Sequence, residues 1–330
     1  MPIRVLVTDY AWSSLVRERS ILKPLGVELI AAETGDVDEL VWLASDVEAI
    51  LTCWAQVDQR VLDAATHCRT VARYGVGLDN IDVAHATRLG MIVTNVPFFC
   101  QEEVADHTML LVLALARQLK PLIDRSAGGN WGLPKGLTPA RIRGKVLGLV
   151  GFGSIAQAVV PRARALGMEV TAFQRSPIDQ ACGRVEVADT LEALLAASDI
   201  VSLHVPLTSE TSRLIDNGAL ERMKSTALLV NTARGGLVDT DALLDALDRG
   251  AIAGAGLDVT DPEPLPADHP LRNRSNVIIT SHTAFNSDGA VADLADQAAT
   301  NVADVLAGRR PNHIVNPDVI RSDHARFRFN

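Results

Sequence analysis

Short apolar runs alternate with longer stretches of helical spacing along the first hundred residues of the chain. The apolar runs lie at 4–8, 27–31, 49–52, 70–73 and 92–94, and helical spacing is found at 15–22 and 83–89. Strands that alternate with helices are typical of βαβ units, in which helices cover both faces of a parallel sheet. The pattern therefore predicts an α/β fold with a doubly wound parallel sheet.

A long apolar segment at 102–119 separates this block from a second one. Its sequence, EEVADHTMLLVLALARQL, is apolar over more than half of a helix circumference, which predicts a helix with at least one buried face. Pro121 is predicted to close this helix. Residues 126–139 contain four glycines, two prolines and Trp131, and they are predicted to form an irregular connection.

The second block repeats the strand–helix alternation. Strands are predicted at 146–150, 169–173, 200–204, 227–231, 252–258 and 277–280, and a final helix at 288–306 ends before Gly308. The pattern alone leaves open where this last helix packs, because it follows the last strand of the second block. The chain could return to the first domain there.

Length and composition narrow the class of protein. The 330 residues suggest two domains or three, and a formal charge of −9 without a basic stripe argues against binding to nucleic acid. No apolar run reaches the roughly 20 residues that span a membrane, and the first residues suit a strand better than a signal peptide. The four cysteines, Cys53, Cys68, Cys100 and Cys182, form no metal or disulfide pattern, so no metal and a cytoplasmic location are expected.

A glycine-rich turn opens the second block. Residues 145–157 read KVLGLVGFGSIAQ, in which a strand leads into Gly151, Gly153 and Ala156 and a helix follows. This is the G-x-G-x-x-(G/A) pattern in the strand–turn–helix context of a dinucleotide site. Gly151 permits the turn, Gly153 lets the backbone approach a pyrophosphate, and the helix N-terminus holds the anion. The alternative is a glycine turn with a purely structural role.

The end of the next strand bears on the choice of cofactor. NAD enzymes usually place an acidic residue there to bind the ribose 2′-hydroxyl, but this chain has Gln174, Arg175 and Ser176. The missing carboxylate removes repulsion against a 2′-phosphate, and Arg175 can bind that phosphate. The sequence therefore predicts NADP or NAD, with NADP suspected, unless Arg175 is only a solvated loop residue.

Four charged or titratable residues fall near the predicted carboxyl ends of strands in the second block. They are Arg234 in VNTARGGLVD, Asp258 and Glu263 in GLDVTDPEP, and His282 in IITSHTA. In an open α/β sheet the ligand crevice lies outside these strand ends. Any one of them could be a surface residue, but four beside a nucleotide loop indicate a catalytic site.

With these motifs the chain resembles the D-isomer-specific 2-hydroxyacid dehydrogenases over almost its whole length, from about Arg4 to Pro317. The matching segments include RYGVGLDNIDV, VTNVP, EEVADHT, LGLVGFGSI, SLHVPLT, NTARGGLVD and SHTA. The resemblance is strongest to the branch of phosphoglycerate dehydrogenases and C-terminal-binding-protein corepressors. It implies reduction of a 2-oxo acid to a D-2-hydroxy acid, or the reverse, as in glyoxylate/hydroxypyruvate reductases.

The resemblance also implies a role for each site residue. Arg234 would hold the substrate carboxylate and 2-oxo group, His282 would be the acid/base, and Glu263 would keep His282 protonated. The backbone amides of Tyr74, Gly75, Val76 and Gly77 would hold the substrate carboxylate together with Arg234 and His282. The residues expected to contact the cofactor are Val104, Gly151, Gly153, Ser154, Ile155, Gln174, Arg175, Ser176, His204, Val205, Pro206, Thr211, Thr232, Ala233, Asp258 and Ala284.

The family fold implies two doubly wound parallel-sheet domains. A flavodoxin-like substrate domain would comprise residues 1–100 and 285–330, and a Rossmann dinucleotide-binding domain residues 101–284. A homodimer supported by the helix at Glu102 is expected. Corepressor relatives use the same scaffold as a dinucleotide-sensing module that binds other proteins, which is the alternative function.

Several side chains keep two interpretations. His204 could lie near the cofactor or be a core histidine, and His107 fits a structural or interface role better than a ligand role. Tyr74 and Trp131 could line the substrate side or contribute only to packing. Cys100 is expected to be a buried, inert thiol. The identity of the 2-hydroxy acid, the direction of the reaction and the role of residues 318–330 do not follow from the sequence.

Overall fold

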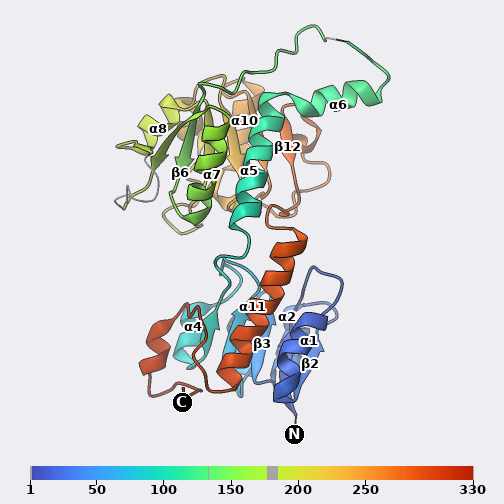
Figure 1. Cartoon of the computed structure of the whole chain (residues 1–330), viewed down its shortest axis with the longest axis vertical. Helices are drawn as coiled ribbons and strands as arrows, with labels where there is room; N and C mark the ends of the chain where they lie inside the picture. The colour runs from blue at the N-terminus through green and yellow to red at the C-terminus, as the bar shows by residue number, and fades with distance from the viewer. Residues whose placement is uncertain (1, 133, 177–184, 330) are drawn as a thin grey trace. The chain divides into compact units, whose positions relative to one another are not determined.

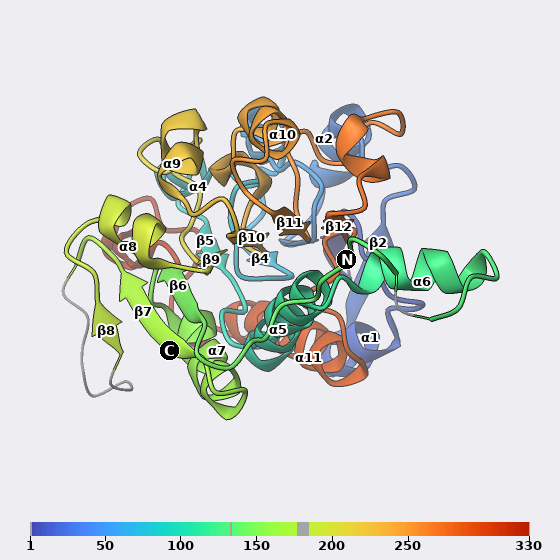
Figure 2. The ribbon, with the colours of Figure 1, turned by 90° about the horizontal axis from the view of Figure 1, so that it is seen from above.

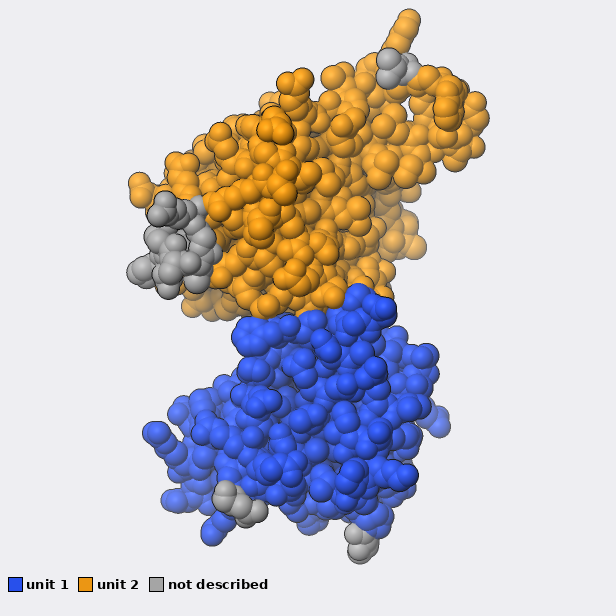
Figure 3. Space-filling model, viewed as in Figure 1, with its two compact units in different colours: residues 1–99, 287–330 blue, residues 100–286 orange. Residues whose placement is uncertain are grey.

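The computed structural model describes residues 2–329 except Leu133 and 177–184. The chain forms two compact units, one of residues 1–99 and 287–330 and one of residues 100–286 (Figures 1 and 3). Each unit has its own parallel sheet. The chain thus passes from the first unit to the second and returns for its last segment.

The sheet of the first unit has five strands in the order β2-β1-β3-β4-β5, which is the flavodoxin-like order. Neighbouring strands align Leu6 with Ile50, Ile50 with Val71, and Val71 with Val93, so that a row of aliphatic side chains crosses one face of the sheet. The strands are β1 (Ile3–Val7), β2 (Val27–Ala31), β3 (Ala49–Thr52), β4 (Thr70–Arg73) and β5 (Ile92–Thr94).

Helices cover both faces of this sheet. The aliphatic row packs against α2 (Val37–Ala44), α3 (Gln59–Ala64) and α4 (Val83–Arg88), whereas α1 (Val16–Leu22) lies beside α11 (Asp288–Leu306), which packs on β3 and β4. The last helix therefore belongs to the first unit. It ends in a Schellman motif, because Gly308 N–H bonds Val305 O and Arg309 N–H bonds Asp304 O while Gly308 has a φ of +71°.

The C-terminal segment also packs on the first unit. Its short 3₁₀ helix, Pro317–Arg321, precedes a tail in which Phe327 is buried with Ile92 and Val305. The guanidinium of Arg326 donates to Ala65 O at 2.7 Å. These contacts give residues 318–329 a structural role that the sequence left unassigned.

The second unit has a seven-stranded sheet in the order β12-β11-β10-β9-β6-β7-β8, and all its pairs are parallel. Apart from the added β12, this is the doubly wound Rossmann order. From β6 the chain adds strands first on one side and then, beginning with β9, on the other, so the strand order reverses between β6 and β9 while all strands stay parallel. The strands are β6 (Val146–Val150), β7 (Glu169–Phe173), β8 (Glu186–Val187), β9 (Ile200–Leu203), β10 (Leu228–Asn231), β11 (Gly254–Leu257) and β12 (Val277–Ile279).

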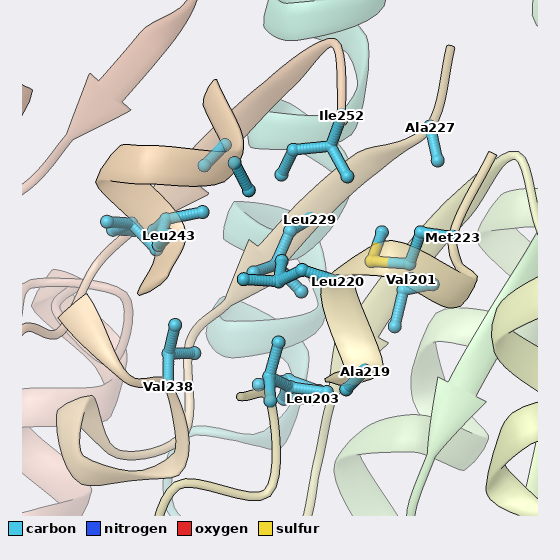
Figure 4. Packing of buried hydrophobic residues seen from close by; sticks show 14 of the residues in the cluster. Val201, Leu203, Ala219, Leu220, Met223, Ala227, Leu229, Val238, Leu243 and Ile252 are labelled. Atoms are coloured by element: carbon cyan, nitrogen blue, oxygen red, sulfur yellow. The ribbon is translucent and has the colours of Figure 1, made fainter. Parts of the chain in front are cut away.

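Two helical layers cover this sheet (Figure 2). On one face α5 (Gln101–Ala116) lies against α7 (Ser154–Ala165), and on the other are α8 (Leu191–Ala197), α9 (Asn217–Arg222) and α10 (Thr240–Asp248). Figure 4 shows part of the core on this second face, to which β9 and β10 contribute Leu203 and Leu229, and α9 and α10 contribute Leu220 and Leu243. Burial of such side chains stabilises the unit by roughly 1.5–3 kcal/mol each.

The predicted α/β class with two doubly wound parallel sheets is confirmed. One local prediction was wrong, and one strand was missed. Pro121 does not close the long helix, because α5 ends at Ala116 and Gln118 turns the chain with a φ of +52°. Pro121 lies in the first turn of the next helix, α6 (Leu119–Ala127). The N–H that proline lacks would have no helical partner in a first turn, so no helical hydrogen bond is lost there. The short strand β8 was not predicted.

Candidate active site

The glycine turn lies where the strand order of the second sheet reverses, after β6. Gly151 has a φ of +93°, and a Cβ added there would lie 2.6 Å from the carbonyl oxygen of His204, which follows β9. Any side chain at this position would collide with the neighbouring strand end. Gly153 differs, because it has an ordinary φ of −75° and a Cβ added there would meet no atom within 4 Å.

The start of α7 fits the pyrophosphate of a dinucleotide. Gly153 is its N-cap residue and supplies no side-chain cap, and the first turn contains no acidic residue. Gly153 and Ser154 are exposed. The first N–H groups of this 12-residue helix are therefore accessible to an anion, which the helix dipole also favours.

Gln174 is tied to the glycine turn. Its Oε1 accepts a hydrogen bond of 3.2 Å from the N–H of Phe152, while Arg175 and Ser176 are exposed. The pKa of Glu210 is lowered, mainly by hydrogen bonding from Thr208 and less by the charge of Arg175. The cation at the end of β7 thus faces some negative charge from the 208–211 turn.

The segment after β9 contains four of the residues expected near the cofactor. His204 is hydrogen-bonded through Nε2 to the Ser202 hydroxyl at 2.9 Å, and burial lowers its pKa to about 4. His204 is therefore neutral near pH 7. Thr211 accepts from Thr208 N–H at 2.8 Å and donates to Pro206 O at 2.6 Å, so it fixes the turn that follows Val205.

The turn after β10 carries Arg234 and is held by a residue that the sequence analysis did not single out. Asn231 is fully buried, accepts from Ala233 N–H at 3.0 Å and donates to Arg234 O at 2.8 Å. The Thr232 hydroxyl lies 3.0 Å from that of Thr108 on α5, and Thr108 donates to Val104 O at 2.8 Å. An asparagine directly before a turn could have been identified from the sequence as a local backbone cap.

His282 and Glu263 form a hydrogen-bonded pair. Nδ1 of His282 lies 2.6 Å from Oε1 of Glu263, and Oε2 of Glu263 accepts from Thr260 N–H at 3.4 Å. Burial alone would raise the pKa of Glu263, but the hydrogen bond and charge of His282 outweigh it and the pKa is lowered. The carboxylate is thus ionised at neutral pH and can accept a hydrogen bond from Nδ1 of His282.

Asp258, after β11, holds the backbone of the turn that carries His282. Its side chain is only 1 % exposed, and its carboxylate accepts from Thr283 N–H and Ala284 N–H, both at 2.9 Å. Its carbonyl oxygen accepts from His282 N–H at 2.7 Å. Asp258 and Ala284 were expected near the cofactor, and the structure shows them joined by a hydrogen bond.

The loop after β4, in the first unit, contains the four residues expected to bind the substrate carboxylate. Gly75 has a φ of +143°, and a Cβ added there would lie 2.8 Å from the guanidinium of Arg73, so this position requires glycine. Gly75 O accepts from Val96 N–H at 3.0 Å, and Val76 O accepts from Asn95 Nδ2 at 2.9 Å. Val76 is exposed and Gly77 is partly exposed.

The side chain of Tyr74 packs inside the first unit and does not line a pocket. It is 1 % exposed, it meets Trp12 edge to face, and its hydroxyl donates to Glu18 Oε1 at 3.2 Å. The side chain of Tyr74 is therefore engaged in packing, while the proposed role of residue 74 concerns its backbone N–H. Trp131 is instead 90 % exposed.

Three cysteines lie in the described part of the chain. Cys53, Cys68 and Cys100 are buried free thiols, and burial raises the pKa of each to about 12, whereas Cys182 lies outside the described residues. Within 2–132, 134–176 and 185–329, no three His, Cys, Asp or Glu side chains gather as metal ligands. None of the helices described is long and apolar enough to cross a membrane.

Comparison with known protein families gives a match to the second unit of the chain. Residues 109–284 match the model of the D-isomer specific 2-hydroxyacid dehydrogenase, NAD binding domain. This range lies within the second unit and includes the glycine turn, Arg234, Glu263 and His282.

Curated and solved relatives cover nearly the whole chain. A glyoxylate reductase of Korarchaeum cryptofilum is 40 % identical, and the match covers 90 % of this chain and 88 % of that protein. A glyoxylate reductase of Thermofilum pendens is 39 % identical, and the match covers 86 % of each chain. A Thermus thermophilus protein of known structure is 38 % identical with a TM-score of 0.88, covering 95 % of this chain and all of its own. An NADPH-dependent glyoxylate/hydroxypyruvate reductase of Sinorhizobium meliloti, in complex with NADP and malonate, is 28 % identical with a TM-score of 0.87, covering 100 % and 99 %.

Proposed function

This chain belongs to the D-isomer specific 2-hydroxyacid dehydrogenase family, and from that premise we propose that its substrates are glyoxylate and hydroxypyruvate. It is an NAD(P)-dependent 2-oxo acid reductase. The substrate names come from the relatives, whose matches extend over both units. The dinucleotide-sensing module is not favoured, because these relatives are enzymes.

One observation carries the catalytic assignment. Nδ1 of His282 is committed to Glu263 at 2.6 Å, and the turn bearing His282 follows β12 at the same sheet edge as the turn of Arg234. A histidine oriented through one ring nitrogen can hold a proton on the other, which is the arrangement needed for general acid catalysis.

The reaction places one demand on the chain at the oxygen of the 2-oxo group, which is an aldehyde in glyoxylate and a ketone in hydroxypyruvate. NAD(P)H, held by the residues named below, would supply the hydride for the 2-oxo carbon. As the carbon–oxygen double bond becomes single, the oxygen takes the proton held on Nε2 of His282, and a 2-hydroxy acid forms. His282 would then be reprotonated from solvent, and Glu263 would stabilise the imidazolium that forms before each proton transfer.

Arg234 and the loop after β4 would orient the substrate. A guanidinium can bind a carboxylate through two parallel hydrogen bonds, and Arg234 is partly exposed at its turn. The backbone N–H groups of 74–77 are proposed to bind the same carboxylate. The charge of the Arg234 guanidinium would favour small anionic 2-oxo acids over neutral ketones.

The dinucleotide would be bound by segments that follow β6, β9, β10, β11 and β12 and by one residue of α5. Gly151 to Ile155 would hold the pyrophosphate, 204–206 and Thr211 would line the site after β9, and Thr232 and Ala233 would do so after β10. Val104, Asp258 and Ala284 would lie on the nicotinamide side. The fit of the α7 N-terminus to an anion supports this assignment.

NADP is the proposed preferred cofactor. Gln174 stands where an acid would bind a 2′-hydroxyl, and the exposed Arg175 and Ser176 follow it. Ser176 offers a hydroxyl donor, and Arg175 a charged one. The proximity of Glu210 to Arg175 lessens the positive potential, so we expect NADH to retain some activity.

The reaction is tested by initial rates with glyoxylate, hydroxypyruvate, pyruvate and phenylpyruvate, each with NADPH and NADH. Glyoxylate or hydroxypyruvate should give the highest kcat/KM, and His282→Ala should lower kcat about 10²–10⁴-fold, the usual contribution of a positioned acid. His85→Ala, at a surface pair with Asp63 in the first unit, is the matched control. Near-native kcat in His282→Ala would refute the assignment.

The cofactor preference is tested with Arg175→Ala. Loss of a charge-assisted bond should lower kcat/KM for NADPH about tenfold or more and leave that for NADH unchanged. Arg222→Ala, which removes an exposed cation from α9, is the control. A wild-type enzyme that strongly prefers NADH would reject the preference.

A cytoplasmic homodimer is proposed as the working form. Leu110 on α5 and Leu119 and Ile123 on α6 are exposed large apolar side chains of the second unit, which a second copy could cover. Light scattering after size-exclusion chromatography would measure the mass. A monomer at micromolar concentration would contradict this form.

A further inference from the structure

The turn that carries His282 has an unusual backbone. His282 has a φ of +54°, in the left-handed region that few residues other than glycine adopt. Such a conformation persists only where the surroundings impose it. Here all three successive N–H groups of 282–284 bond to Asp258, one to its carbonyl oxygen and two to its carboxylate.

Two further side chains hold the carboxylate of Asp258. The Thr280 hydroxyl donates to Asp258 Oδ1 at 2.6 Å, and Nε2 of His107 lies 3.0 Å from that hydroxyl oxygen. Because the single hydroxyl proton of Thr280 is committed to the carboxylate, the imidazole must be the donor to Thr280. A chain of hydrogen bonds therefore runs from His107 on α5 through Thr280 to Asp258.

The chain of bonds is well shielded from water. The side chain of Asp258 is 1 % exposed and that of His107 is 16 % exposed. Hydrogen bonds to an ionised group in such surroundings fix geometry more strongly than bonds at the surface. The three hydrogen-bonded residues also come from different elements of the second unit: His107 from α5, Thr280 from the end of β12, and Asp258 from the end of β11.

We propose that His107 and Thr280 are positioning residues, which act through Asp258 to hold His282 where it can deliver its proton. This inference rests on the proposed role of His282 as the acid. Neither His107 nor Thr280 needs to touch substrate or cofactor. Loss of either should misplace the imidazole in the transition state while leaving ground-state binding intact.

The test compares Thr280→Val, which keeps the shape and removes the hydroxyl, with Thr280→Ser, which keeps the hydroxyl. We expect kcat per dinucleotide-binding site to fall on the order of tenfold in Thr280→Val, with KM for the 2-oxo acid unchanged, and to be restored in Thr280→Ser. Thr171→Val removes a comparable buried hydroxyl bond, to Glu186 O in the same unit, and is the control. Titration with NADPH counts the folded sites, so a loss of folded protein cannot pass for slow chemistry.

A double-mutant cycle tests whether His107 and Thr280 act together. His107→Met alone should also lower kcat, and His107→Gln, which can still donate, should recover most of it. In Thr280→Val the further change His107→Met should have little effect, because the chain is already broken. Additive losses, or a wild-type kcat in Thr280→Val, would overturn the inference.

The outcome for His282 separates the two proposals. If His282→Ala is inactive and Thr280→Val is as fast as the wild type, only the positioning role fails. If His282→Ala retains near-native kcat, the proposed function fails first, whatever the Thr280 variants show.

Discussion

Gly153→Ala offers a test that separates binding of the dinucleotide from stability of the fold. The φ of Gly153 is −75°, which alanine adopts without strain, and a Cβ there meets no protein atom within 4 Å. Alanine is a poorer N-cap than glycine but reduces the entropy of the unfolded chain. These effects oppose one another, so the free energy of unfolding without cofactor should change by less than about 1 kcal/mol.

The same methyl group should obstruct an anion at the start of α7. If it displaces the pyrophosphate from one helix N–H, it removes a hydrogen bond to a charged group, which contributes about 1.5–3 kcal/mol. The dissociation constant should therefore rise on the order of 10- to 100-fold. Gly151→Ala should behave differently, since its Cβ would lie 2.6 Å from His204 O and the fold itself should be destabilised.

Fluorescence titration and thermal unfolding with and without NADPH measure both effects. At 100 times the wild-type Kd, the cofactor should stabilise the wild type by about 2.7 kcal/mol but a 100-fold weaker variant by only about 0.4 kcal/mol. Gly218→Ala, in α9 and away from the turn, should bind NADPH as the wild type does and should be more stable by up to about 1 kcal/mol, with or without the cofactor. Wild-type affinity in Gly153→Ala would refute the assignment of the pyrophosphate to this helix.

Two predictions concern stability of the first unit. Tyr74→Phe removes the hydrogen bond from the Tyr74 hydroxyl to the buried Glu18 and should lower the free energy of unfolding by about 1–3 kcal/mol. The control Tyr10→Phe changes an exposed ring and should have little effect. Equal midpoints of the two variants in chemical denaturation would contradict this prediction. Hydrogen bonds from the Thr34 hydroxyl and from Glu33 N–H lower the pKa of Glu39 from 4.5 to about 2. Glu39→Gln should therefore lower the Tm above pH 4.5, and the difference should vanish as the pH falls toward 2; a pH-independent difference would show that the charge is not responsible.

Strand positions were well predicted because they depend on local pattern. Six predicted strands, including 27–31 and 146–150, have the observed bounds, and others differ at their ends. Their apolar residues line a sheet that is buried on both faces, so the signal is continuous. The two residues of β8 lacked such a run, because both are exposed.

Features that depend on contacts between residues far apart in the sequence could not be predicted from the local pattern. The final helix was predicted at its observed bounds, but its packing on β3 and β4 depends on residues more than 200 positions earlier. Pro121 misled the prediction because the sequence signals a break without saying on which side of it the helix ends. Only the left-handed Gln118 shows that a new helix starts before the proline.

The candidate site also contains features that the local pattern predicts and features that it does not. Arg234, Glu263 and His282 could be named because parallel strands bring their carboxyl ends to one edge, so position relative to a strand end is enough. The His107–Thr280–Asp258 chain could not, since it joins a helix face to two strand ends separated by up to 173 positions. The residues proposed to contact the substrate are thus found in local motifs, whereas the bonds proposed to set their geometry depend on the packing of α5 against the sheet. Substitutions on the buried face of α5 should therefore alter kcat more readily than changes of similar size on its exposed face.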